Sequence, residues 1–166
     1  MSCSLRPVGR AHRARLEQLT AATGLFRTDE VAIAVELLEE SDAGTEDYRF
    51  VGAFAGDDLV GYACWGATPG TQGTWDLYWI VVDPARQGQG IGTQLLTEVE
   101  QRLTADGGRL VVVETSSRTD YVATRRFYER RGYTRAATIP GYYAPGDDLV
   151  IYLKDLAHGV VARATS

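Results

Sequence analysis

A glycine-rich segment between two apolar runs is the part of the sequence best suited to chemistry. It reads Gln87-Gly88-Gln89-Gly90-Ile91-Gly92 and comes directly after Val82-Asp83-Pro84-Ala85-Arg86. Glycines let a backbone approach an anion closely, and the first N–H groups of a helix lack partners within it and lie at the positive end of its dipole. Glycines at such a position can also form nothing more than a tight turn. Of the two, we favour an anion-binding loop at the start of a helix.

Two common nucleotide-binding patterns do not fit this segment. A P-loop needs a Lys-Ser or Lys-Thr pair after its last glycine, and none follows Gly92. The dinucleotide fingerprint fails as well, because its last glycine position is Thr93. A nucleotide-binding βαβ protein is therefore disfavoured.

The elements around the loop predict a βαβ unit. A β-rich run covers residues 74–82 and stops at Asp83-Pro84. Apolar residues then recur at helical spacing up to Asp106-Gly107-Gly108: Ile91, Leu95, Leu96, Val99 and Leu103. The next run, residues 109–114, is almost unbroken in its apolar character, which is typical of a strand covered on both faces.

The rest of the chain predicts helices and antiparallel strands. Before the loop we expect a strand at 4–8, helices at 11–22 and from Thr28-Asp29 to about Glu40, and a hairpin of strands 49–55 and 59–65 around Gly56-Asp57-Asp58. After the βαβ unit we expect a helix at 120–131 and strands at 133–139 and 149–153, separated by a loop at 140–148.

Composition limits the classes of function. The chain has 166 residues, 45% of them hydrophobic, and a net charge of -5, which fits one acidic domain and argues against nucleic acid as a partner. No run is long enough to span a membrane, and Cys3 and Cys64 cannot form a disulfide framework, so we expect a cytoplasmic protein. His12 and His158 lack metal-ligand spacing, and no metal site is predicted.

The loop and a later motif together resemble the GNAT superfamily of N-acetyltransferases. The family's pyrophosphate loop has the form Gln/Arg-x-x-Gly-x-Gly/Ala, which Gln87 to Gly92 matches. Its Phe-Tyr-x-x-x-Gly-Phe signature resembles Phe127 to Tyr133, which follows the loop in the family's order. The resemblance implies an α/β (α+β) GNAT fold: a mixed sheet of about six or seven strands, with an antiparallel N-terminal meander, a central βαβ unit and about four helices. It places the domain at residues 1–156, with a C-terminal tail at 157–166.

The same resemblance implies acetyl-CoA as the co-substrate. Backbone groups of Ile80, Val81 and Val82 would contact the thioester and pantetheine. The pyrophosphate would be held by the loop and the first helical turn: Gln87, Gly88, Gln89, Gly90, Ile91, Gly92 and Thr93. Arg86 and either Arg125 or Arg126 could add phosphate contacts, although a solvated helix face is an equally good interpretation of these arginines.

The expected reaction is direct transfer of the acetyl group to a primary amine in a ternary complex. Tyr128 occupies the tyrosine position of the family signature and is the candidate general acid. Glu114, after the apolar Val111-Val112-Val113, is the first candidate for the general base, with Asp76 and Glu30 as alternatives. A sensor or regulatory module that binds acyl-CoA without catalysis is the alternative function.

The acceptor side of the family's cleft suggests a set of aromatic and charged residues: Phe26, Arg27, Glu30, Asp76, Trp79, Tyr142 and Tyr143. An aromatic wall with carboxylates suits a cationic amine, although aromatic residues on strands more often serve packing. We expect a small-molecule amine or an amino-acid-like acceptor, with Arg27 pointing to a carboxylate on it. A homodimer fits the family.

Overall fold

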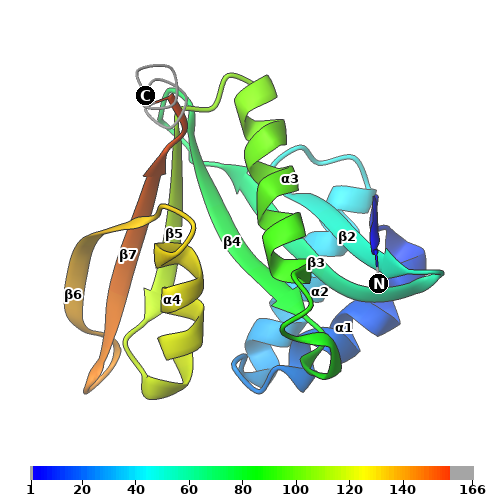
Figure 1. The fold of residues 1–166 in the computed structure, drawn as a ribbon, viewed down its shortest axis with the longest axis horizontal. Helices are drawn as coiled ribbons and strands as arrows, with labels where there is room; N and C mark the ends of the chain where they lie inside the picture. The colour runs from blue at the N-terminus through cyan, green and yellow to red at the C-terminus, as the bar shows by residue number, and fades with distance from the viewer. Residues whose placement is uncertain (1, 158–166) are drawn as a thin grey trace. The chain divides into compact units, whose positions relative to one another are not determined.

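The structure, a computed structural model, describes residues 2–157. This range contains both helices and strands (Figure 1). The strands are β1 (Ser4–Arg6), β2 (Arg49–Ala55), β3 (Asp58–Ala67), β4 (Thr74–Val82), β5 (Leu110–Ser116), β6 (Thr134–Ala144) and β7 (Asp147–Asp155). The α-helices are α1 (Arg13–Ala22), α2 (Thr28–Asp42), α3 (Ile91–Ala105) and α4 (Val122–Glu129), and the short 3-10 turns are η1 (Arg10–His12), η2 (Pro84–Arg86) and η3 (Thr119–Tyr121).

The strands form one mixed sheet of seven strands, in the order β1-β2-β3-β4-β5-β7-β6. β1, β2 and β3 pair antiparallel, β4 runs parallel to β5, and β5, β7 and β6 pair antiparallel. The predicted α/β class, the N-terminal antiparallel strands and the β4-α3-β5 unit are confirmed. The chain packs as two compact units, residues 2–67 with 78–102 and residues 68–77 with 103–157.

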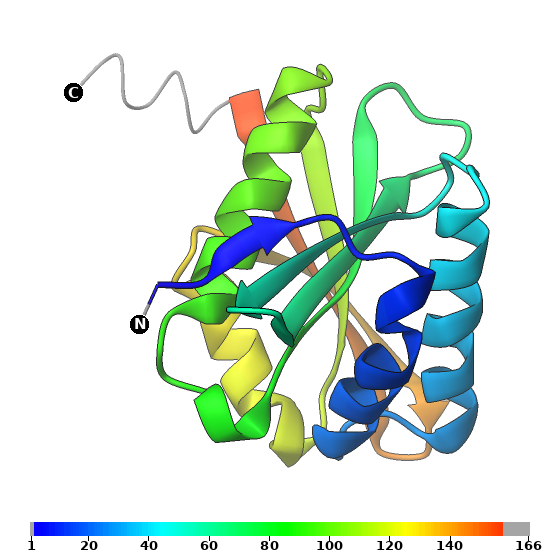
Figure 2. The same cartoon turned by 90° about the vertical axis from the view of Figure 1, so that its right-hand side faces the viewer.

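The first unit has its core between two helices and the N-terminal strands. Figure 2 shows α1 and α2, in blue, lying side by side. Each helix turns its apolar residues to one side, as amphipathic helices do. The buried cluster includes Leu16 and Leu19 of α1, Leu38 of α2, and Phe50, Phe54 and Tyr62 of the strands. None of the helices among residues 2–157 is long and apolar enough to cross a membrane.

A glycine of β3 lets α3 sit close to the sheet. A Cβ placed on Gly61 would lie 2.9 Å from the Val81 carbonyl oxygen, 3.2 Å from Ile91 and 3.3 Å from Leu95. Ile91 and Leu95 are buried on the helical face that the sequence predicts. The missing side chain at Gly61 therefore sets how deeply the first two turns of α3 pack.

The second unit is built on the β5-β7-β6 ladder. Val113 pairs with Tyr152, and Ile139 pairs with Leu149. α4 turns Tyr128 inward, and Lys154 Nζ of β7 donates a hydrogen bond of 2.9 Å to the Arg131 carbonyl just beyond the helix. These contacts fix the helix that carries the candidate acid to the ladder that carries Glu114.

The expected loop at residues 140–148 is wrong, because β6 runs through Pro140 to Ala144 and only a tight turn separates it from β7. Pro140 disrupts a central strand but is tolerated here, since β6 is the last strand of the sheet. The pairing of β6 with β7 is irregular between Ile139 and Ala144, the segment that contains this proline. Tyr142 and Tyr143 therefore lie on a strand.

Other boundaries differ by a few residues. The second helix begins at Thr28 with Arg27 as its N-cap, so Thr28 and Asp29 lie in its first turn and do not cap it. β5 continues past Glu114 to Ser116, and its Leu110 and Val112 are only half-buried, so one of its faces is less covered than the apolar run suggested. The expected tail at 157–166 lies almost wholly outside the described residues, as does His158, and the boundary of the 1–156 domain stays a prediction.

Candidate active site

The loop before α3 is shaped by a carboxylate and two glycines. Asp83 accepts a hydrogen bond of 2.9 Å from the Ala85 N–H, which caps the turn that follows β4. Gly88 and Gly90 both have φ of +80°, a left-handed conformation that costs residues with a Cβ about 1–2 kcal/mol. A Cβ on either glycine would meet no atom of the described residues within 4 Å.

The loop leads straight into α3. The Gly90 carbonyl accepts a hydrogen bond of 3.0 Å from the Gln94 N–H, so Gly90 is the first residue to take part in the helix. In any helix the N–H groups of the first turn find no acceptor within the helix. Gln87 to Gly90 are exposed, and Ile91 is buried and anchors the turn. This arrangement suits an anion held by main-chain groups.

The preceding strand offers backbone at Ile80, Val81 and Val82. Val81 is buried, whereas Ile80 and Val82 are half-buried. The parallel ladder with β5 joins Thr74 through Asp76 to Leu110 through Val112. The three residues predicted to contact pantetheine thus lie beyond the part of β4 that pairs with β5.

Tyr128 is a buried phenol in an aromatic cluster. Its side chain is 3% exposed, and its ring packs edge-on against Phe127 and Tyr133, at centroid distances of 5.2 and 5.3 Å. Burial raises the pKa of Tyr128 well above the ordinary value, and the nearby Arg131 lowers it only in part. The hydroxyl is therefore protonated at neutral pH and can act as a proton donor.

Glu114 and Asp76 lie on one face of the sheet. Asp76 pairs with Val112 in register, and paired or alternate residues of neighbouring strands share a face. Glu114 is the next residue of β5 on that face. Desolvation raises the pKa of Glu114, and the Asp76 carboxylate raises it further. A carboxylate shifted in this direction is a better proton acceptor than an ordinary glutamate.

The charge of Glu114 affects the ionisation of Tyr143. Desolvation and then the Glu114 carboxylate raise the pKa of Tyr143 to about 12. Tyr142 packs edge-on against Tyr143 at 5.0 Å, and their side chains are 56% and 42% exposed. Asp76, Glu114, Tyr142 and Tyr143 thus belong to the second unit, and the roles expected for them, Glu114 as the base and the others as acceptor contacts, stay predictions.

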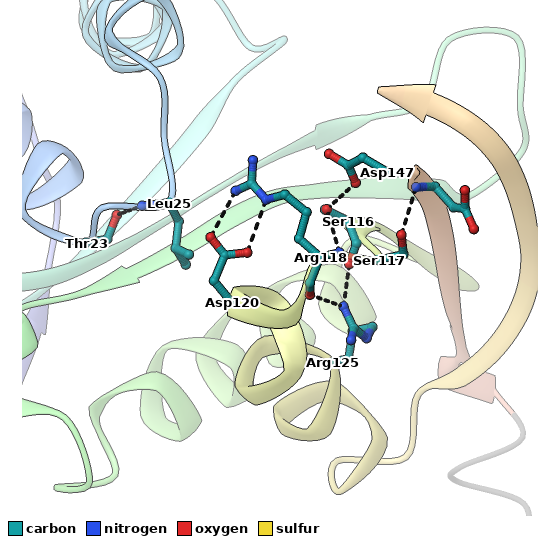
Figure 3. Close-up of polar contacts among 9 residues, drawn as sticks. Thr23, Leu25, Ser116, Ser117, Arg118, Asp120, Arg125 and Asp147 are labelled. Atoms are coloured by element: carbon teal, nitrogen blue, oxygen red, sulfur yellow. Dashed lines mark hydrogen bonds and ion pairs between the residues drawn. The ribbon is translucent and has the colours of Figure 1, made fainter. Parts of the chain in front are cut away.

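Polar contacts tie the end of β5 to the β6-β7 turn (Figure 3). Ser116 Oγ bonds with Asp147, and the Asp148 N–H donates to Ser117 Oγ at 2.8 Å. An Asp148 side-chain oxygen in turn accepts a hydrogen bond from the Gly141 N–H at 2.8 Å. The residues next to Tyr142 are therefore held by the same strand that carries Glu114.

The first unit gathers Phe26 and Trp79. Their rings meet edge-on at 6.1 Å, and Trp79 Nε1 donates a hydrogen bond of 3.0 Å to the Tyr62 hydroxyl. The buried Tyr62 hydroxyl also bonds with Thr20 Oγ1 at 2.6 Å. The indole of Trp79 is thus held in place by its hydrogen bond to Tyr62, which is itself bonded to Thr20 in the core.

Comparison with known proteins decides the family. The model of the acetyltransferase (GNAT) family matches residues 15–133, which is more than half of the chain. The chain belongs to the GNAT family.

Individual relatives agree with this assignment. A solved structure from Desulfovibrio desulfuricans, assigned to the GNAT family, is 40% identical, has a TM-score of 0.88, and is matched over 93% of this chain and 99% of that one. The N-alpha-acetyltransferase RimI of Mycobacterium tuberculosis is 39% identical over 57% of this chain and 58% of its own length. The S-(2-succino)cysteine N-acetyltransferase of Bacillus subtilis is 33% identical over 43% of this chain and 44% of its own length. The chain thus spans about half the length of these two curated relatives.

Two predicted acceptor residues of this GNAT domain are engaged in local structure. Glu30 Oε2 accepts a hydrogen bond of 2.7 Å from the Arg27 N–H, which caps α2. The Arg27 guanidinium pairs with Asp29 at 3.1 Å, and this contact raises the pKa of Arg27. Glu30 is therefore a weaker alternative for the base than Asp76.

Several residues of this GNAT domain have supporting roles that the sequence patterns did not reveal. Gly61 seats α3, Tyr62 fixes Trp79, and Arg15 pairs with Asp83 at 2.8 Å. Arg125 donates to the Ser116 and Arg118 carbonyls, which gives that arginine a structural role. No group of three or more His, Cys, Asp or Glu residues within 2–157 could hold a metal ion.

Proposed function

We propose that this chain transfers the acetyl group of acetyl-CoA to a primary amine by direct attack in a ternary complex. One observation carries the proposal: in a GNAT domain, the exposed Gln87 to Gly90 loop opens a helix whose first N–H groups suit a pyrophosphate. Main-chain groups of Ile80, Val81 and Val82 bind the pantetheine arm, and the loop through Thr93 binds the pyrophosphate. These groups are already ordered, so binding costs little conformational entropy.

The residues of the second unit supply the proton transfers. The amine nitrogen attacks the thioester carbonyl carbon, the C–N bond forms, and the C–S bond then breaks with its electron pair left on sulfur. Tyr128 donates its phenolic proton to that sulfur, and Glu114 accepts the proton released by the amine, directly or through a water molecule. The protonated Tyr128 and the raised pKa of Glu114 support these roles.

The acceptor is proposed to be a small cationic amine or an amino-acid-like amine. The carboxylates of Asp76 and Glu114 attract an ammonium group, and the exposed rings of Tyr142 and Tyr143 suit contact with it. In the first unit, Phe26 and Trp79, whose rings meet edge-on, are proposed as further contacts of the acceptor. The free thiols of Cys3 and Cys64 favour a reducing compartment, and we place the reaction in the cytoplasm.

Two measurements on the purified protein test this function. Calorimetry with acetyl-CoA is expected to show one binding site, and release of free thiol is expected with at least one amine from a panel of amino acids, polyamines, aminoglycosides and peptides with free N-termini. Binding without thiol release on any acceptor would indicate an acyl-CoA sensor. Tight binding of NAD or ATP without binding of acetyl-CoA would contradict the proposal.

A further inference from the structure

Arg15 of α1 connects three elements of the first unit. Its NH1 donates to Gln18 of the same helix at 2.8 Å, and its Nε donates to the Leu59 carbonyl at 3.1 Å and to Asp58 at 3.2 Å. Its NH2 donates to Asp83 at 2.8 Å. The side chain is only 29% exposed, so this guanidinium is held among its partners and does not extend into solvent.

Asp83 is the partner that connects Arg15 to the glycine loop. Its second carboxylate oxygen caps the turn after β4 through Ala85, and its own N–H donates to the Val60 carbonyl at 2.9 Å. The hydrogen bond from Ala85 lowers the pKa of Asp83, and Arg15 lowers it further. Asp83 is thus an ionised carboxylate, 19% exposed, at the entrance of the loop.

An ionised carboxylate at this position opposes the ligand proposed for the loop. Two like charges near a protein surface repel each other strongly enough to weaken binding of a pyrophosphate. The cap is nevertheless needed, because it fixes the turn that leads to Gln87. Arg15 reduces this conflict, since its bond to Asp83 keeps the cap in place and its positive charge, which it shares with Asp58, offsets part of the charge of Asp83.

We propose that Arg15 is a positioning residue for the acyl donor, which holds the entrance of the loop through Asp83 and reduces the repulsion between that carboxylate and the pyrophosphate. The inference rests on the proposed binding of acetyl-CoA at this loop. Arg15 itself touches none of the reacting atoms. Its effect is on the nucleotide part of the donor and leaves the acetyl transfer step unchanged.

The test compares two acyl donors. Arg15→Gln is expected to raise Kd and KM for acetyl-CoA about tenfold, while kcat changes little. S-acetylpantetheine lacks the pyrophosphate, so its kcat/KM is expected to be the same in the variant and the wild type. Added salt is expected to reduce the difference for acetyl-CoA, because salt screens exposed charges. Arg13→Gln is the matched control, since Arg13 lies on the same helix and pairs with the remote Glu39 at 3.0 Å.

Substitution of Asp83 separates charge compensation from a merely structural ion pair. Asp83→Asn keeps an oxygen for the cap and removes the charge, so it is expected to tighten acetyl-CoA binding about threefold. Arg15→Gln combined with Asp83→Asn is expected to recover most of the lost affinity. If both single variants weaken binding equally, or if S-acetylpantetheine loses as much as acetyl-CoA, the proposal is overturned.

Two further outcomes are distinguishable. If Arg15→Gln is too unstable to purify, Arg15→Lys can replace it, because lysine keeps the positive charge but lacks the planar set of N–H donors of the guanidinium. We expect this variant to bind acetyl-CoA about threefold more weakly and to use S-acetylpantetheine normally. An equal loss with both donors would again overturn the role. If the wild-type protein does not bind acetyl-CoA at all, the proposed function fails. If it binds but Arg15→Gln matches the wild type, only the role of Arg15 fails.

Discussion

The loop before α3 and the face of β5 around Glu114 offer a ligand different kinds of groups. From Gln87 to Gly90 the backbone is exposed and is shaped by two glycines in the left-handed conformation. Around Glu114 the side chains affect one another: Asp76 raises the pKa of Glu114, and Glu114 raises that of Tyr143. The first region depends on local backbone geometry, whereas the second depends on which residues the sheet brings together.

This difference separates two kinds of mutational effect. Changes in the loop should alter the affinity for acetyl-CoA and leave the chemical step alone. Changes around Tyr128 and Glu114 should alter turnover and its pH dependence and leave the affinity for acetyl-CoA alone. Variants of Tyr128, Glu114, Gly90 and Tyr62 test this division.

The largest effect is expected at Tyr128. Tyr128→Phe removes the proton donor and keeps the ring, so kcat is expected to fall at least about 100-fold with unchanged Kd for acetyl-CoA. Tyr133→Phe is the matched control, because that buried phenol packs against Tyr128 and is given no role in proton transfer. Full turnover by Tyr128→Phe, measured by thiol release, would remove Tyr128 from the mechanism.

The next effect is expected at Glu114. A general base works only when ionised, so kcat/KM of the wild type should fall at low pH, with the midpoint above 4.5 because the pKa of Glu114 is raised from that value. Glu114→Gln is expected to lower the rate about tenfold to 100-fold and to abolish this acidic limb. Asp76→Asn removes a charge that raises the pKa, so it is expected to move the limb to lower pH.

A pH-rate profile from about pH 5 to 9 measures both variants. If Glu114→Gln keeps the wild-type rate and profile, Asp76, Glu30 or bulk water must accept the proton. If Asp76→Asn moves the limb to higher pH, the two carboxylates do not interact as proposed.

A smaller effect is expected in the loop. Gly90→Ala forces a Cβ into a left-handed conformation at a cost of about 1–2 kcal/mol, which corresponds to about tenfold weaker binding of acetyl-CoA if the loop relaxes to another conformation. Gly107, at the other end of α3, has φ of +77° and equally open surroundings among the described residues. Gly107→Ala carries the same backbone cost and is expected to bind acetyl-CoA normally in calorimetry. Equal Kd values for the two variants would contradict a role for the loop.

The smallest effect is expected at Tyr62, whose hydroxyl accepts the hydrogen bond of the Trp79 indole. Tyr62→Phe removes the acceptor of the indole hydrogen bond, so KM for the acceptor amine is expected to rise about threefold, with a stability loss of about 1 kcal/mol. The Kd for acetyl-CoA and kcat are expected to stay unchanged. If the variant instead binds acetyl-CoA more weakly, Tyr62 supports binding of the acyl donor and not of the acceptor amine.

Local patterns were enough to predict the main features of the fold and the loop. The strand end at Asp83-Pro84, the glycines and the spacing of Ile91, Leu95 and Leu96 all act within a few turns of chain, so β4, the loop and α3 could be predicted. The roles of Arg15 and Tyr62 could not, because their contacts to Asp83 and Trp79 join residues 68 and 17 positions apart. Pro140 was misleading for the same reason, since only the order of the strands shows that it lies at an edge.

Gly61 shows why the glycine motif of the loop is not sufficient to infer the activity from a sequence. A methyl group there would collide with the Val81 carbonyl and with the side chains that seat α3. A homologous chain could therefore keep every letter from Gln87 to Thr93 and still present its pyrophosphate loop on a displaced helix. Such a chain would contain the glycine pattern and is nevertheless expected to bind acetyl-CoA poorly, so a glycine at this position of β3 is a second feature to require when the activity is assigned to relatives.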